Sequence, residues 1–315
     1  MRQAGRSLPE YRKLKERYSM EEMFHRPEIA ARVTCFPIET LGVDAAILFA
    51  DILTLPAQMG FQIHFDKNNG PVILNPLRRI RDVRNVRDFA DLSYVSETIK
   101  EVNQKLPLHV PLIGFAGSPF TVLCYLLEGG SSTSFTTTLR FMNEYPSAFQ
   151  KLLTILTKNT IAYLNLQKNA GIKAFQLFDS WGGILRETDY ADWVLPYVQK
   201  IFKNVDLPSI YYLKNSNHLL ALMEKSGADF LSVCHTVVLG ENPILKKTKK
   251  GIQGNLFNGL LYAERRVLAK EIQNLLKGAR QYKKYIFNLS HGVFPDTDVE
   301  TLKFIVERVH QWGKI

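Results

Sequence analysis

Two arginines near the start of the chain have the chemistry best suited to holding a polyanion. Arg2 and Arg6 lie four positions apart, with Ala4 and Gly5 between them and Pro9 shortly after. Glycine and proline here indicate a loop rather than the interior of a helix. A guanidinium stays charged at any working pH and can bind a carboxylate through two parallel hydrogen bonds. The pair therefore suits a substrate with several carboxylates, although a solvated basic tail would carry the same charges.

Four more polar side chains stand where apolar, strand-like runs end. Asp51, Ser180 and His291 each lie at the end of such a run, and Tyr125 lies in the helical segment after another. In α/β barrels the chemistry gathers at the C-terminal ends of the strands. We therefore expect one cavity to be surrounded by these residues: Arg2, Arg6, Asp51, Tyr125, Ser180 and His291.

Each of these four positions also has an ordinary structural interpretation. Asp51 and Ser180 could be helix N-caps, a common use of both residue types after a strand. Tyr125 in an apolar helix could be a core residue, and His291 could be a turn residue. No single position decides between the two interpretations.

The elements that would position these residues alternate between strands and helices. We predict strands at 44–51, 110–117, 174–180, 209–215, 230–236, 251–256 and 285–292. Helical spacing covers 147–170, 190–202, 218–225, 260–276 and 299–311, and residues 62–64 and 72–74 resemble an inserted hairpin. Such alternation favours an α/β fold with a parallel sheet. Seven strands are one short of a (β/α)8 TIM barrel, so we expect that barrel with its first strand missing or truncated.

Length and composition favour one large domain. The chain has 315 residues, 46% of them hydrophobic, and we take residues 1–315 as a single domain. No uninterrupted apolar run reaches the ~18 residues that a membrane span needs, and no secretory signal is visible. Three widely spaced cysteines fit reduced thiols in a cytoplasm. The net charge of +10 indicates either an anionic partner or a merely basic surface.

The residue sequences of several motifs resemble those of one protein family. The runs are Arg-Gln-Ala-Gly-Arg at 2–6, Phe-Ala-Gly-Ser-Pro-Phe-Thr at 115–121, Phe-Asp-Ser-Trp-Gly-Gly at 178–183 and Asn-Leu-Ser-His-Gly at 288–292. They resemble motifs of the uroporphyrinogen decarboxylases, in the same order along the chain. The resemblance implies a TIM barrel, usually a cytoplasmic homodimer, that converts the acetate side chains of uroporphyrinogen to methyls. The product would be coproporphyrinogen, in haem and chlorophyll synthesis.

The resemblance also assigns roles to the candidate residues. Protonating a pyrrole makes the ring its own electron sink, so we expect neither a metal nor an organic cofactor. Asp51 would stabilise the cationic ring, because preorganised charge is commonly a large catalytic contribution. Arg2 and Arg6 would bind substrate carboxylates, and one of them is a candidate proton relay. Tyr125, Ser180 and His291 would orient the periphery of the substrate.

The chain departs from the family pattern in several places. Ser7 stands where an aromatic residue is usual, Val-Cys-His-Thr at 233–236 replaces Leu-Asp-Trp-Thr, and Gly-Asn-Leu-Phe-Asn at 254–258 replaces Gly-Asn-Leu-Asp-Pro. We expect these changes to loosen packing near the cleft, with Asn258 free to cap the following helix.

The start of the chain departs as well, because Met1 directly precedes the arginine motif. We expect a shortened, poorly soluble or weakly active form, with open strand edges at 46–50 and 285–289.

Two other functions remain open. The first is a corrinoid- or thiol-linked methyltransferase, whose fold this family shares. Such enzymes bind zinc with a His-x-Cys pair, and none of the seven histidines here has a cysteine two places later. The second is an RNA-binding protein, with basic runs at 78–81 and 246–250. No RNA-binding motif accompanies these runs, so we expect neither a nucleic-acid nor a membrane partner.

Overall fold

The computed structural model describes residues 7–66 and 70–313. Within them, seven parallel strands form one sheet in the order β1-β4-β5-β6-β7-β8-β9, and β2 and β3 form a separate antiparallel hairpin. The bounds are β1 Ala46–Ile47, β2 Ile63–Asp66, β3 Gly70–Ile73, β4 Leu112–Gly117, β5 Ala174–Asp179, β6 Ser209–Leu213, β7 Phe230–Ser232, β8 Gly251–Leu256 and β9 Tyr285–Leu289.

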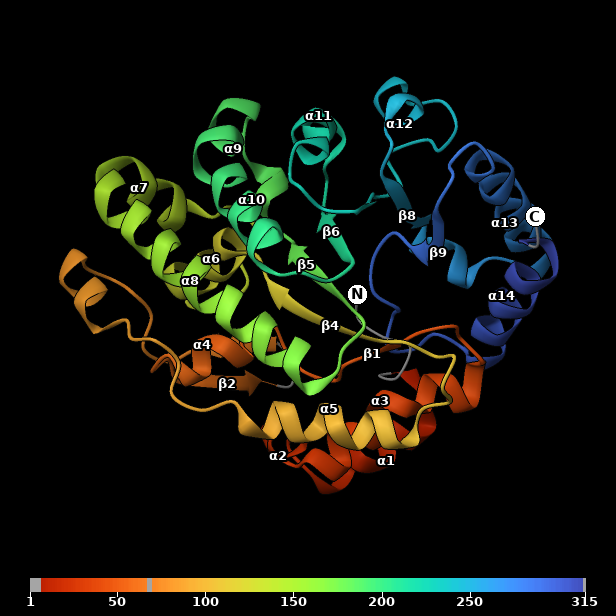
Figure 1. The fold of residues 1–315 in the computed structure, drawn as a ribbon, viewed down its shortest axis with the longest axis horizontal. Coiled ribbons are helices and arrows are strands. Elements are labelled where there is room, and N and C mark those ends of the chain that lie inside the picture. Colours follow the sequence, from red (N-terminus) through yellow and green to blue (C-terminus); the bar gives the residue numbers. More distant parts are fainter. Residues whose placement is uncertain (1–6, 67–69, 314–315) are drawn as a thin grey trace.

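The helices lie around the outside of the sheet, which is curled (Figure 1). They are α1 Pro9–Arg17, α2 Met20–His25, α3 Pro27–Leu41, α4 Thr54–Gln58, α5 Ser93–Lys105, α6 Pro119–Glu128, α7 Thr136–Glu144, α8 Pro146–Ala170, α9 Glu187–Trp193, α10 Leu195–Asn204, α11 Leu220–Glu224, α12 Pro243–Lys247, α13 Arg265–Ala279 and α14 Val299–Trp312. Short 3₁₀ helices are η2 Ile80–Asn85, η3 Gly182–Ile184, η4 Asn217–Leu219 and η5 Asn258–Tyr262. None of the helices in the described ranges combines the length and apolarity needed to cross a bilayer.

The central strands are largely apolar because both faces of a parallel sheet are covered, although β5 and β8 also carry buried polar side chains. Every residue of β6 and β8 is buried. Helix α8 is fixed to the sheet by Gln167, whose side chain donates to the carbonyl of Phe115 at 2.9 Å and accepts from its N–H at 3.0 Å. This pair of bonds sets the level of α8 against the middle of β4.

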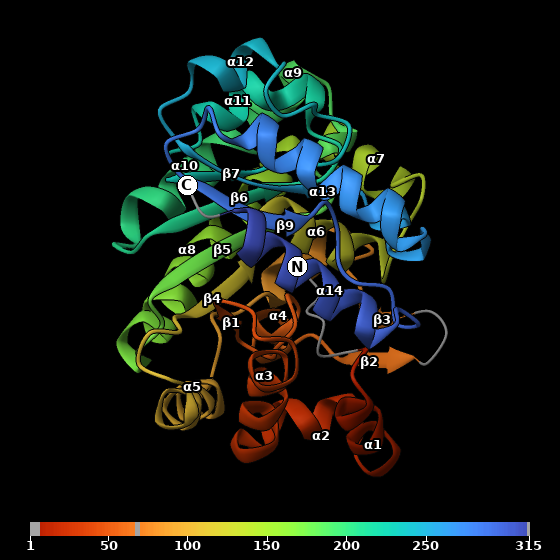
Figure 2. The ribbon, with the colours of Figure 1, turned by 90° about the vertical axis from the view of Figure 1, so that its right-hand side faces the viewer.

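The terminal strands of the sheet, β1 and β9, do not pair with each other. Helices that pack together bridge the two ends of the sheet. Helix α14 packs against both α13 and α3, and His310 on α14 lies 2.9 Å from Asp44, just before β1. Both views place α14 where the C-terminal strands approach the N-terminal helices (Figures 1 and 2). A second apolar cluster contains side chains from α1–α3, α13 and α14, with Phe49 and Leu256 beside them. These contacts hold the sheet in its curled form.

The predicted parallel sheet, its seven strands and the inserted hairpin are confirmed. Strands β1 and β7 are shortened most relative to the prediction, because their backbones turn to side-chain partners. The N–H of Phe49 bonds to Thr34 Oγ1, which takes the chain out of β1, and the N–H of His235 bonds to Ser290 Oγ beyond β7. Seven parallel strands lie in the described ranges, and the expectation that the first strand of the barrel is missing or truncated stays a prediction.

Candidate functional site

The four described candidate residues lie at one edge of the sheet. Asp51 follows β1, Tyr125 lies on α6 directly after β4, Ser180 follows the last residue of β5, and His291 follows β9. All of these strands are parallel, so their C-terminal ends face the same way. The predicted arginines, at positions 2 and 6, lie outside the described residues.

Asp51 is held in a tight turn between β1 and α4. Its Oδ1 accepts the N–H of Leu53 at 3.0 Å, and its own N–H donates to Thr54 Oγ1 at 3.1 Å. Asp51 is not the N-cap of α4, because the helix begins at Thr54 with Leu53 at the cap position. The helix-cap alternative is therefore wrong, and the turn gives this half-buried carboxylate a fixed orientation.

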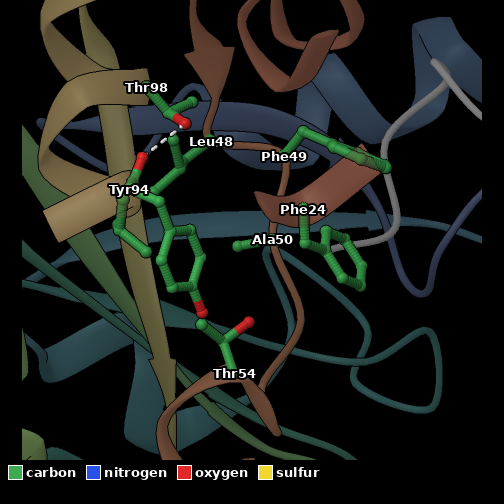
Figure 3. Close-up of a pocket in the computed structure, with 8 residues that line it drawn as sticks. Phe24, Leu48, Phe49, Ala50, Thr54, Tyr94 and Thr98 are labelled. Atoms are coloured by element: carbon green, nitrogen blue, oxygen red, sulfur yellow. Dashed lines mark hydrogen bonds between the residues drawn. The ribbon is translucent and has the colours of Figure 1, made fainter. Parts of the chain in front are cut away.

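The loop that carries Asp51 rests on tightly packed side chains. A cavity of about 10 Å³ lies beneath it, lined among others by Leu48, Ala50, Thr54 and Tyr94 (Figure 3). This volume holds at most about one water molecule. Burial raises the pKa of Tyr94 to about 12, so its hydroxyl is protonated at neutral pH. The base of the Asp51 loop is therefore packed and uncharged.

A larger pocket lies on the flank of this region rather than at the sheet edge. It measures about 420 Å³ and is lined by side chains of α2, α4, β2 and the start of α5. Its lining includes two carboxylates, Glu21 and Glu22, and three aromatic rings, Phe24, Phe61 and Phe65. Leu53 and Thr54 of the Asp51 turn line this pocket. Tyr125, Ser180 and His291 are not among its lining residues.

Tyr125 contacts the loop that carries Ser180. Its ring lies 4.0 Å from the Trp181 ring, centroid to centroid, with the planes inclined by 35°. The Phe135 ring also contacts the Trp181 ring, with a centroid distance of 4.8 Å. Tyr125 is half-buried and packs against the main apolar core, whereas Leu123 and Leu127 on the same helix are fully buried. The aromatic contact fixes Tyr125 and Ser180 relative to each other.

Asp179, the residue before Ser180, accepts hydrogen bonds from several elements, a role that the sequence alone did not indicate. It is 0% exposed, and it accepts from Ser118 Oγ at 3.0 Å, Thr121 Oγ1 at 2.6 Å, Tyr211 OH at 2.9 Å and the N–H of Gly182 at 2.9 Å. These donors come from α6, β6, the loop after β5 and the residue preceding α6. One carboxylate thus connects three strand ends to the loop of Ser180 and Trp181.

The environment of Asp179 combines burial with several donors. Burial raises the pKa of its carboxyl above the ordinary value, and the bonds from Thr121, Tyr211, Ser118 and Gly182 oppose this shift. Tyr211 also shares a 2.7 Å bond with Tyr190, and burial raises the pKa of both phenols. A methyl group at Gly182 would lie 2.9 Å from Asp179 Oδ2, so the glycine allows this close approach.

The loop of His291 is fixed by Asn258, one of the residues that depart from the family pattern. Asn258 Oδ1 accepts the N–H of His291 at 2.8 Å, and Asn258 Nδ2 donates to the carbonyls of His291 at 3.1 Å and Gly292 at 2.6 Å. The prediction that Asn258 caps the next helix is wrong, because Phe257 and Glu264 occupy the cap positions of η5 and α13. The asparagine instead holds the His291 turn, whose exposed side chain faces solvent.

The other departures also contact one another. The His235 ring lies 4.6 Å from the Phe257 ring, and its Nδ1 is 2.9 Å from Ser290 Oγ. Asn255 Nδ2 donates to the carbonyls of Cys234 and Val237. The expected loosening is not observed here, because the two replaced segments pack together.

A curled parallel sheet of this type, with polar side chains gathered at its C-terminal edge, is typical of enzymes of the α/β-barrel class. The sequence profile of uroporphyrinogen decarboxylases matches residues 1–312. The chain is 42% identical over 315 residues to the uroporphyrinogen decarboxylase of Thermodesulfovibrio yellowstonii, covering 99% of this chain and 92% of the relative. It is also 42% identical to that of Listeria innocua, covering 100% and 91%. The chain therefore belongs to the uroporphyrinogen decarboxylase family.

Solved structures share the fold at lower identity. A methyltransferase from Methanosarcina mazei has a TM-score of 0.79 and 20% identity, covering 93% of this chain and 88% of that one. A B12-independent methionine synthase from Shewanella has a TM-score of 0.62 and 13% identity, covering 93% and 90%. At these identities the likeness is evidence of fold alone. In the described ranges, no group of three or more His, Cys, Asp or Glu side chains is placed to hold a metal.

Proposed function

We propose that the chain decarboxylates the acetate side chains of uroporphyrinogen to methyls, giving coproporphyrinogen in haem and chlorophyll synthesis. The observation that carries this proposal is the family match over residues 1–312, together with identities near 42% over nearly the whole of the relatives. Ser180 and His291 at the C-terminal edge of the sheet support it, because they lie in runs that resemble motifs of the family.

Asp51 is the residue proposed to act on the reacting ring. Protonation of a pyrrole carbon makes the ring cationic, and breaking the bond to CO2 returns its electron pair to the ring. A proton then adds to the exposed methylene carbon and the ring loses its own, so each acetate exchanges CO2 for one proton. A carboxylate oriented by the Leu53 N–H stabilises the cation at the stage where positive charge is largest.

The periphery of the substrate is proposed to contact the remaining candidates. Tyr125, Ser180 and His291 can donate hydrogen bonds to carboxylates. Arg2 and Arg6 are proposed to bind acetate or propionate groups through charge-assisted bonds, each contributing about 1.5–3 kcal/mol. One of the two arginines is proposed as the proton relay.

The domain organisation, the oligomeric state and the location in the cell are proposals as well. We infer a single (β/α)8 domain, a homodimer and a cytoplasmic location, with uroporphyrinogen as the small-molecule partner. The buried, unpaired thiols of Cys35, Cys124 and Cys234 support a reducing compartment. Sedimentation of the purified chain tests the dimer.

Anaerobic incubation with uroporphyrinogen tests the activity. We expect the pool of products to move from eight carboxylates towards four, measured by chromatography after oxidation to porphyrins. A chelator such as EDTA should leave the rate unchanged. An unchanged octacarboxylate, together with methyl transfer to a thiol in a parallel assay, would favour the methyltransferase alternative instead.

The paired arginines give a prediction of their own. Arg2→Ala and Arg6→Ala should each weaken uroporphyrin binding about 10-fold or more, because each removes a charge-assisted contact of at least ~1.5 kcal/mol. Fluorescence quenching of the porphyrin measures the dissociation constant. Arg32→Ala, at an exposed position of α3, is the matched control and should bind normally. Unchanged binding by both variants would mean that the arginines are solvated surface.

A further inference from the structure

Five arginines lie within ten residues on one exposed segment between β3 and α5. They are Arg78, Arg79, Arg81, Arg84 and Arg87, all exposed, and we refer to them as the arginine strip. Two aspartates in the neighbourhood are already engaged. Asp82 accepts the N–H groups of Arg78 and Arg79, and Asp88 is bound by Lys158 and Asn159. The strip therefore presents a net positive surface.

The strip lies beside the candidate site. The N–H of Leu77 donates to the carbonyl of Leu126 on α6 at 2.8 Å. A methyl group at Gly129, at the end of α6, would lie 3.3 Å from Arg78 Nη2. Gly129 is about one helical turn beyond Tyr125. The first arginine of the strip is thus about one turn from a residue of the candidate site.

The strip also projects beyond the C-terminal edge of the sheet. Gln167 on α8 is level with Phe115 in β4, and Lys158 on α8 contacts Asp88 at the end of the segment. Lys158 lies nine residues earlier than Gln167 on a helix antiparallel to the strands, which places it ~13 Å towards the C-terminal edge. The orange segment that precedes α5 extends at the left of Figure 1, away from the sheet.

We propose that the arginine strip is an electrostatic capture surface that favours the octacarboxylate substrate over the tetracarboxylate product. This inference rests on the proposed decarboxylase function. Long-range attraction scales with the charge of the ligand, and each decarboxylation removes one negative charge. The strip therefore attracts incoming substrate strongly and holds the product weakly, which favours entry of one and departure of the other.

A polycarboxylate suits the strip better than RNA does. Nucleic-acid surfaces combine basic side chains with aromatic rings on which bases stack. Residues 78–87 contain no aromatic residue, and the exposed apolar side chain among them is Ile80. The surface thus offers charge without a stacking platform.

A charge-matched pair of triple variants tests the strip. The first is Arg81→Gln/Arg84→Gln/Arg87→Gln, and the control is Lys246→Gln/Lys247→Gln/Lys249→Gln. The control lysines immediately precede β8, which begins at Gly251, so they lie at the opposite edge of the sheet. Both variants lose the same net charge. Stopped-flow fluorescence gives the association rate constants of uroporphyrin and coproporphyrin, at ~10 mM salt, where the Debye length is ~30 Å, and at ~0.5 M.

At low salt we expect the arginine variant to bind uroporphyrin about 10-fold more slowly than the unmodified chain. Coproporphyrin carries half the charge, so its rate should fall only about 3-fold, the square root of that factor. High salt should abolish both differences, and the lysine control should change either rate less than about 2-fold.

Equal effects of the two triple variants would overturn the proposal, since net charge rather than the strip would then govern capture. Equal effects on the two porphyrins would overturn the charge discrimination. Tighter competition by single-stranded RNA than by uroporphyrin would assign the strip to nucleic acid. If the unmodified chain turns over uroporphyrinogen but the arginine variant binds uroporphyrin at an unchanged rate, the role of the strip is refuted and the proposed function stands. If the unmodified chain does not turn over uroporphyrinogen, the proposed function on which the strip rests is refuted.

Discussion

Asp51→Asn is expected to lower kcat by at least about 100-fold while the fold stays intact, because it removes a preorganised charge from the reacting ring. The asparagine keeps the shape of the side chain and an oxygen that can still accept the N–H of Leu53. The turn before α4 should therefore survive. Rates with uroporphyrinogen under anaerobic conditions and a thermal melt measure the two parts of this prediction.

A nearby aspartate gives the matched control for this variant. Asp44 lies just before the same strand, is exposed, and contacts His310. Asp44→Asn should keep near-normal activity. If Asp51→Asn also turned over at a near-normal rate, the catalytic role assigned to its charge would be wrong.

Asp179→Ala is expected to destabilise the protein by about 3 kcal/mol or more, because buried donors left without an acceptor cost about 1–3 kcal/mol each. Four donors converge on this carboxylate, and one of them is the N–H of Gly182 in the loop next to Ser180. The folded fraction should also show a KM raised about 10-fold, because a loosened Trp181 no longer fixes Tyr125. Urea denaturation and steady-state kinetics measure the two effects.

Tyr190→Phe separates stability from positioning. It removes the bond to Tyr211 but leaves every direct donor of Asp179 in place. We expect a lower free energy of unfolding, by about 1 kcal/mol, with an unchanged KM. A KM raised equally in both variants would mean that Asp179 acts through general stability alone.

Asp179→Asn adds a dependence on pH. Burial raises the pKa of the folded carboxyl above its ordinary value of 3.8, so its contribution to stability is full below that value and is lost as pH rises through the folded pKa. The asparagine does not titrate. The stability deficit of Asp179→Asn relative to the unmodified chain should therefore shrink as pH rises from ~4 towards neutrality. A deficit that grew over this interval would contradict the raised pKa.

Local sequence patterns were sufficient for the sheet. The run 112–117 is apolar along its whole length, which is typical of strands buried on both faces, and all seven strands lie within the predicted runs. The ends of β1 and β7 were less predictable. They depend on side chains remote in sequence, since Thr34 and Ser290 take the backbone N–H groups that would otherwise continue the ladder.

The candidate site was predictable only in part for the same reason. The edge of the sheet on which Asp51, Ser180 and His291 lie follows from the strand ends. The function of Asp179 depends on donors 32 to 61 positions away in the chain, so no local pattern indicates it. Its position at the end of a buried strand was the one available signal, because a carboxylate there must find partners.

The replaced segments illustrate a further limit. Each change, taken alone, predicts lost packing near the cleft. The structure pairs His235 with Phe257 and places Asn258 against the His291 turn, so the changes compensate each other. A single sequence does not show which residues meet across adjacent strand ends.

Turnover in heavy water, with the methyl groups of the product examined by NMR, tests the central claim most directly. If the chain replaces each acetate CO2 with a solvent proton, every newly formed methyl of coproporphyrinogen should carry one deuterium. The Asp51→Asn variant should form such methyls at least about 100-fold more slowly. Retention of all eight carboxylates by the unmodified chain, or new methyls without deuterium, would contradict the account.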